Sequence, residues 1–109
     1  MPAAIINDVK DDVGFESCGE GCFILSGALT FATVPHVYAQ GNAVFAESGG
    51  SLTLDLQGIK HTDSAGLALL LEWMRTAQHQ DQHIHFKNIP AQMLSIARLS
   101  GLDTVLPLS

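Results

Sequence analysis

Hydrophobic residues follow two different spacings in the second half of the chain, and each spacing predicts one kind of element. Residues 51–56 alternate apolar and polar side chains, which places three leucines on one face of a strand. Residues 64–80 instead carry apolar side chains at helical spacing, with Asp63 or Ser64 in the N-cap position. The side chains expected to face the core from this helix are Leu67, Leu70, Leu71, Met74 and Gln78. We therefore predict a strand followed by an amphipathic helix that ends near Gln80.

Weaker patterns predict the elements that come before this pair. Two short apolar runs, at 13–17 and 22–26, flank the turn residues 19–21 and indicate an antiparallel hairpin. A helix is expected to begin after Thr33, a residue suited to the N-cap, and to end before the glycine pair at 49–50.

The end of the chain is predicted to add a strand, a helix and a final short strand. Residues 84–86 form the first strand, and Pro90 opens a last helix that Gly101 stops. Its side chains expected to face inward are Met93, Leu94, Ala97 and Leu99. Val105 and Leu106 are expected to form the final strand.

The predicted order is strand, strand, helix, strand, helix, strand, helix, and this order indicates the fold class. The unit from Leu52 through Phe86 is β-α-β, so its two strands should lie parallel in one sheet, joined by a right-handed crossover. We therefore expect an α/β fold with helices packed on a sheet. The chain has 109 residues, and we expect residues 1–109 to form a single domain in which 1–12 are a polar lead-in.

Composition and charge exclude several classes of function. Hydrophobic residues make up 47% of the chain and charged residues 15%, which favours an ordered core. The formal net charge of −6 leaves no basic surface for nucleic acid. No apolar run approaches the roughly 18 residues of a membrane span, and no secretory signal is visible. We expect a soluble cytoplasmic protein without direct membrane insertion.

Cysteine and histidine residues offer little chemistry. Cys18 and Cys22 flank a turn, and a metal site would need two further ligands among His79, His83 and His85, which spacing alone does not bring together. The interpretation we favour is two ordinary thiols near a hairpin, because a disulfide is geometrically conceivable but disfavoured in the cytoplasm. No nucleophile motif or phosphate-binding loop occurs, so neither catalysis nor a metal or other cofactor is expected.

The connection at residues 61–67 is the most informative segment, because it sets hydroxyl groups and an acid at the start of a helix. One interpretation is a simple cap, in which Asp63 or Ser64 accepts hydrogen bonds from free backbone N–H groups and contributes about 1 kcal/mol. The other is a recognition or phosphorylation point at Ser64, because the N-terminus of a helix accommodates added negative charge. The sequence leaves both interpretations open.

A second feature of the same helix favours recognition. If the predicted stripe faces inward, Leu69 and Trp73 lie one turn apart on another side, with Ala65 one turn before Leu69. An exposed apolar strip that includes the only tryptophan would suit a protein interface, and the equal alternative is that the next helix covers it.

Four segments together resemble the STAS domain family, named for sulfate transporters and anti-sigma-factor antagonists. They are residues 52–56, 62–71, 84–86 and 94–102. The resemblance implies a STAS-like (SpoIIaa-like) fold, a mixed four- or five-stranded sheet with helices packed on it, and a protein-binding role without catalysis. In the anti-sigma-factor antagonists the hydroxyl immediately before the glycine accepts phosphate from a partner kinase, and Ala65 occupies that position here.

Within the family the turn is more similar to the MlaB-like branch, a small STAS subunit of the bacterial Mla phospholipid-transport ABC complex. This resemblance implies a cytoplasmic subunit that binds the ATPase of the transporter, with its permease, and supports outer-membrane lipid asymmetry. The alternative is a regulatory protein of the anti-sigma-factor-antagonist type controlled by phosphorylation at Ser64. A lipid-binding module has only the high apolar content in its favour. The residues expected to bind the partner are Thr62, Asp63, Ser64, Ala65, Leu69 and Trp73.

Overall fold

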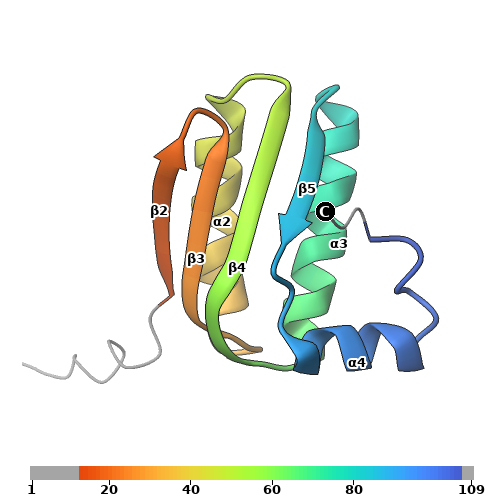
Figure 1. The fold of residues 1–109 in the computed structure, drawn as a ribbon. Helices are drawn as coiled ribbons and strands as arrows, with labels where there is room; N and C mark the ends of the chain where they lie inside the picture. Colours follow the sequence, from red (N-terminus) through yellow and green to blue (C-terminus); the bar gives the residue numbers. More distant parts are fainter. Residues whose placement is uncertain (1–12, 107–109) are drawn as a thin grey trace, which may run out of the picture.

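The computed structural model describes residues 13–106, which alternate between strands and helices (Figure 1). The polar lead-in expected at 1–12 lies outside the described residues. The elements are β2 (Gly14–Gly19), β3 (Cys22–Leu29), α2 (Val34–Ala46), β4 (Ser51–Thr62), α3 (Ser64–His79), β5 (His83–Lys87) and α4 (Ala91–Leu99). Their order confirms the predicted succession of strands and helices.

The strands form one mixed sheet in the order β2-β3-β4-β5. β2 pairs antiparallel with β3, whereas β3 with β4 and β4 with β5 are parallel. The register sets Leu52 opposite Ile84 and Leu54 opposite Phe86, so the apolar positions of neighbouring strands share one face. The expected hairpin and the parallel β-α-β unit are therefore both confirmed.

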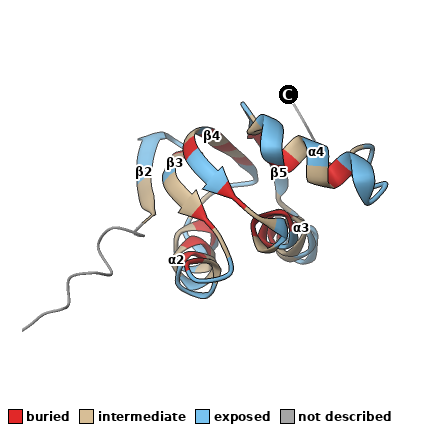
Figure 2. Ribbon diagram, turned by 90° about the horizontal axis from the view of Figure 1, so that it is seen from below, coloured by how far each residue is buried: buried red, intermediate tan, exposed pale blue. Residues whose placement is uncertain are grey.

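Two helices cover the apolar face of this sheet. Figure 2 shows α2 and α3 side by side beneath the strands, and the buried residues concentrate between the two layers. An aromatic group fills the space under β2 and β3, with the Phe45 ring centroid 5.2 Å from that of Trp73 and 5.8 Å from that of Phe23. α4 lies apart, against α3 and the end of β4. The core is thus a single layer between the sheet and two helices.

The last part of the described chain departs from expectation. Val105 and Leu106 lie in a turn and a bend rather than a strand. Leu99, expected to face inward, is 89% exposed, while Met93 and Ala97 are fully buried. The short α4 buries only a narrow side against its neighbours, and a residue two positions after Ala97 points away from that side. The predicted strand at 105–106 does not form because two apolar residues without a partner strand cannot join a sheet.

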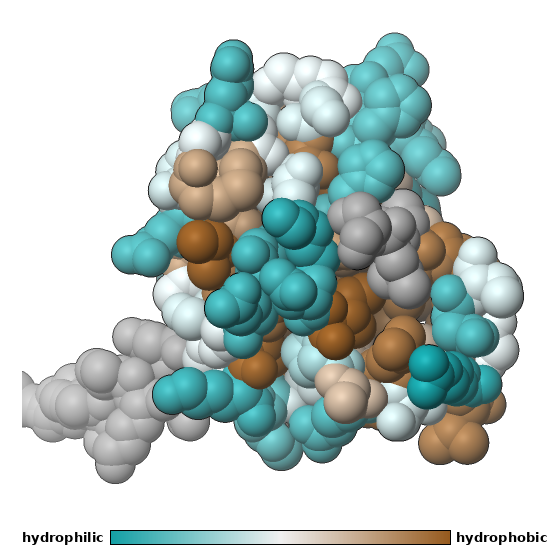
Figure 3. Space-filling view, viewed as in Figure 1, coloured by the Kyte–Doolittle hydropathy of each residue, from teal (hydrophilic) through white to brown (hydrophobic). Residues whose placement is uncertain are grey.

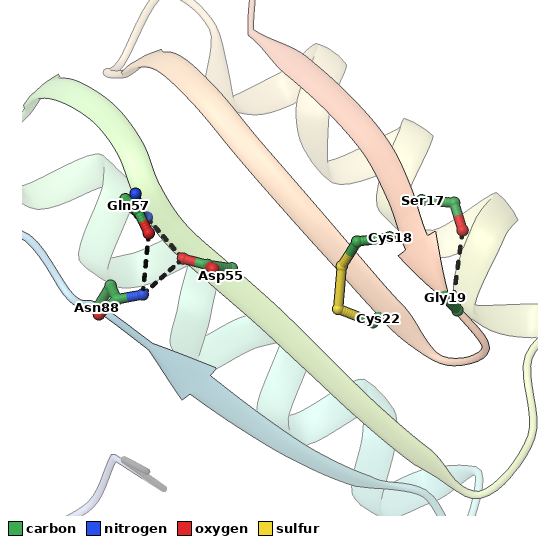
Figure 4. The surroundings of a disulfide bond; sticks show 7 residues. All are labelled: Ser17, Cys18, Gly19, Cys22, Asp55, Gln57 and Asn88. Atoms are coloured by element: carbon green, nitrogen blue, oxygen red, sulfur yellow. Dashed lines mark hydrogen bonds between the residues drawn. A yellow bond between two sulfur atoms is a disulfide. The ribbon is translucent and has the colours of Figure 1, made fainter.

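The two cysteines form a disulfide, contrary to the expectation of free thiols (Figure 4). The hairpin register pairs Gly19 with Cys22 and contains an irregularity between Ser17 and Gly19. This turn brings the Cα atoms of Cys18 and Cys22 to 5.2 Å, within the usual range for a disulfide. Among the residues that the structure describes, no three histidine, cysteine or acidic side chains cluster as a metal site.

Candidate functional site

The connection between β4 and α3 is held by Asp63, the N-cap residue of α3. Its backbone is extended, and its carboxylate accepts a hydrogen bond from the Ala65 N–H at 2.9 Å. The other carboxylate oxygen accepts the Phe31 N–H from the β3–α2 loop at 3.1 Å. One side chain therefore caps the helix and ties two connections together, so the capping interpretation is correct for Asp63.

Thr62 belongs to the framework beneath the site. Its side chain is fully buried, and its hydroxyl lies 2.9 Å from the Leu29 carbonyl, to which it donates. Its backbone N–H donates to the Gln92 side chain at 3.2 Å. A side chain enclosed in this way holds β3, β4 and α4 together and is not exposed to a partner.

Ser64 is exposed at the start of α3, and Ala65 beside it is half-buried. Gly66 follows because α3 approaches the sheet too closely for a side chain. A Cβ at Gly66 would lie 2.9 Å from the Leu29 carbonyl oxygen and would also collide with the Thr62 hydroxyl. This close approach leaves the Ser64 hydroxyl at the open N-terminal end of the helix, where the backbone dipole favours negative charge.

The expected exposed strip does not exist as such, because Leu69 is 2% exposed and Trp73 is fully buried. α3 packs against α2 as well as the sheet, so its buried side is turned toward α2. The Trp73 ring lies against Gly41, where a Cβ would come within 3.1 Å of the indole nitrogen, and stacks edge-on with Phe45. The cover is α2 and not the last helix.

The predicted inward stripe of α3 is corrected in the same way. Leu67 and Leu70 are buried as expected, but Leu71 and Met74 are only partly buried and Gln78 is exposed. The positions that the stripe omitted complete the core. They are Gly66, Leu69, Trp73 and Ala77.

An apolar surface that the sequence did not reveal lies beside Ser64. Phe31, in the loop before α2, is 83% exposed, and its own N–H is fixed by Asp63. Three residues after Phe31, Val34 begins the lining of a shallow groove of about 290 Å³ between α2 and α3. The groove is lined by Val34, Pro35, Tyr38, Ala68, Leu69 and Glu72. We call Ser64, Phe31 and these lining residues the helix-end surface.

Charge is sparse on the helix-end surface. α2 contains no lysine, arginine, aspartate or glutamate. On α3, Glu72 lies 3.7 Å from Arg75 in an exposed pair, which contributes little. A solvent-facing aromatic side chain beside a mostly apolar groove has the character of a contact surface.

The opposite face of the sheet is of a different kind. No described helix covers it in Figure 1, and Figure 3 shows hydrophilic side chains across its middle beside smaller hydrophobic areas. There the Asn88 side chain and the Gln57 backbone N–H each donate to Asp55 at 2.9 Å, and these bonds lower the pKa of the Asp55 carboxyl below its ordinary 3.8. This carboxylate braces two neighbouring strands.

A sequence comparison places the chain in a described family. The family model described as "Mlab, STAS domain" matches residues 20–107, which is most of the chain. No curated protein matches the chain. None of the helices in the described residues is long and apolar enough to cross a membrane.

Solved structures with the same fold include proteins of different function. The unphosphorylated anti-sigma factor antagonist SpoIIAA has a TM-score of 0.68 at 18% identity, covering 89% of this chain and 87% of its own. An anti-sigma factor antagonist from Mycobacterium paratuberculosis has a TM-score of 0.65 at 22% identity, covering 88% and 82%. SLC26A9 has a TM-score of 0.63 at 19% identity, covering 78% of this chain but 17% of its own. The family match and the shared fold agree, and the chain belongs to the STAS domain family, in its Mlab type.

Proposed function

We propose that this chain is a non-catalytic, cytoplasmic subunit of an ABC transporter that moves phospholipid to maintain outer-membrane lipid asymmetry. It binds the ATPase subunit, which works with the permease, and supports its assembly or activity. The family match to the Mlab type supports this assignment. The observation that carries it is the helix-end surface, where an exposed aromatic side chain adjoins an open groove and an exposed hydroxyl.

The polar residues of the site are suited to contact rather than to chemistry. Both carboxylate oxygens of Asp63 already accept backbone N–H groups, and the hydroxyl of Thr62 is buried in the framework. Ser64 remains for a partner. The chain has Ala65 where the antagonists of the family carry their phosphate-accepting hydroxyl. The ATP site then lies on the partner.

Phe31 is the residue expected to contribute most to binding. An aromatic side chain that is 83% exposed in the free protein has most of its apolar area left to bury. Central aromatic residues in interfaces commonly cost about 2 kcal/mol or more when truncated. The partner is expected to supply an apolar ridge for the groove and a polar group for Ser64.

Binding of the purified chain to the purified ATPase subunit tests this proposal. Phe31→Ala should weaken the complex about tenfold or more, and Ser64→Glu should weaken it by adding an unpaired charge to the contact. Leu99→Ala is the matched control, because Leu99 is 89% exposed but lies on α4, away from the helix-end surface. Equal affinity for wild type, Phe31→Ala and Ser64→Glu would reject this surface.

A second candidate is a regulator of the anti-sigma-factor-antagonist type, and the exposure of Ser64 favours it. A phosphate on Ser64 would lie at the N-terminal end of α3, where the helix dipole favours negative charge. This candidate predicts that the native kinase partner phosphorylates Ser64, as detected by mass spectrometry, and that Ser64→Ala abolishes the modification. Failure to find any phosphorylated form would reject this candidate, and only the transporter assignment would remain.

A further inference from the structure

The disulfide occupies an accessible place in the fold. Cys18 is the penultimate residue of the edge strand β2 and is itself exposed, whereas Cys22 is half-buried at the start of β3. Both lie at the tip of the hairpin, on the face of the sheet that no described helix covers (Figure 4). A small molecule can therefore approach the sulfur of Cys18 without any movement of the core.

The hairpin tip is also acidic. Glu16 and Glu20 are both exposed and lie two residues before and two residues after Cys18, Glu16 on β2 and Glu20 in the turn. Residues 14–29 include no lysine, arginine or histidine. A thiolate that carries a second negative charge is repelled at this place, and an ammonium group on the attacking thiolate offsets that repulsion.

We propose that Cys18–Cys22 is a reversible thiol–disulfide exchange site that takes cationic and neutral small thiols ahead of anionic ones. The incoming thiolate bonds to the sulfur of Cys18, the bond between the two protein sulfurs breaks, and its electron pair leaves on Cys22, which takes a proton from water. A second thiolate then attacks the small-molecule sulfur of the mixed disulfide and releases Cys18 as a thiolate. One protein disulfide and two thiols thus become one protein dithiol and one small-molecule disulfide.

Opening the bond is expected to loosen the hairpin without unfolding the domain. The bond closes a short loop, so its loss lowers the folded-to-unfolded ratio about thirtyfold by the loop-entropy relation. The turn stays attached to the sheet because the Thr53 N–H donates to the Gly21 carbonyl at 2.7 Å. The core around Trp73 lies on the other face and is not involved.

The first experiment measures where exchange occurs, using single-cysteine variants of the full chain. Cys22→Ser leaves the exposed sulfur and Cys18→Ser leaves the half-buried one, and each is treated with cystamine, the disulfide of cysteamine, and analysed by intact mass. We expect Cys18 to be modified several-fold faster. Equal rates, or a faster rate at Cys22, would overturn the assignment of Cys18 as the site of attack.

The second experiment measures reduction of wild type by cysteamine, 2-mercaptoethanol and mercaptopropionate at low salt. Each rate is divided by the rate of the same thiol with the uncharged disulfide of 2-mercaptoethanol. We expect the normalised reduction rate with cysteamine to exceed that with mercaptopropionate about tenfold. The ratio of the two rates should fall at high salt and in the double variant Glu16→Gln/Glu20→Gln. Trp73 fluorescence should stay native throughout. A bond that opens only when Trp73 fluorescence reports unfolding, or a ratio near one, would refute the proposal.

Discussion

Replacement of Gly66 by alanine tests the close approach that sets Ser64 at the helix end. In an exposed helix interior this change would stabilise the protein by about 1 kcal/mol through helix propensity. Here the new Cβ would lie 2.9 Å from the Leu29 carbonyl oxygen and 3.1 Å from the Leu29 Cβ, and would collide with the Thr62 hydroxyl. Overpacking costs about 1–3 kcal/mol, and disturbing the buried Thr62 hydrogen bond costs about 1–3 kcal/mol.

The net expectation for Gly66→Ala is a loss of about 2 kcal/mol, or about 8 °C in Tm for a domain of this size. Urea unfolding followed by Trp73 fluorescence measures it, because the only tryptophan is fully buried. Gly49→Ala is the control, since a Cβ there meets no atom within 4 Å. Adding Thr62→Ala should relieve part of the clash, so the two changes should be less than additive. A Gly66→Ala protein as stable as wild type, or more stable, would refute the reasoning.

Three further changes test other contacts. Gly41→Ala should destabilise the protein by about 1–3 kcal/mol in urea unfolding, because the Trp73 ring occupies the space of the new Cβ. Helix propensity alone would make the variant more stable, so a stabilised variant would contradict this prediction. Asp63→Ala should cost about 1 kcal/mol in the same assay, since two backbone N–H groups lose their acceptor, and no loss would contradict the capping role. Asn88→Ala should raise the pKa of Asp55, as followed by NMR titration. The folded-state pKa of Asp55 is lowered, so the ionised carboxylate stabilises the fold above pH 3.8, and this stabilisation is lost as the pH falls through the folded-state pKa. Asp55→Asn should therefore equal wild type in stability only in strong acid.

The sequence contained most of the fold because its periodic segments are long. The alternation in β4 and the capped start of α3 each carry a strong local signal, and in the structure both elements begin where expected. β4 extends further than the alternation, to Thr62, because its pairing with β3 continues past Gly58.

The sequence failed where the outcome depended on a second packing partner. The periodicity of α3 defines an apolar side but not its rotation between the sheet and α2. The sequence therefore leaves Trp73 open between a surface strip and burial under a helix, and the structure places it in the core. Phe31 was overlooked because a single apolar residue in a loop carries no periodic signal. The disulfide depended on the turn irregularity between Ser17 and Gly19, which no spacing rule anticipates.

Affinity purification of the tagged full chain at native expression, with identification and stoichiometry of the chains that accompany it, tests the central claim most directly. The account predicts an ABC ATPase with its permease in fixed ratio from wild type and from Leu99→Ala, and their loss from Phe31→Ala. Recovery of an anti-sigma kinase in place of the ATPase would contradict the account. Full retention of the ATPase by both single variants, Phe31→Ala and Ser64→Glu, would also contradict it.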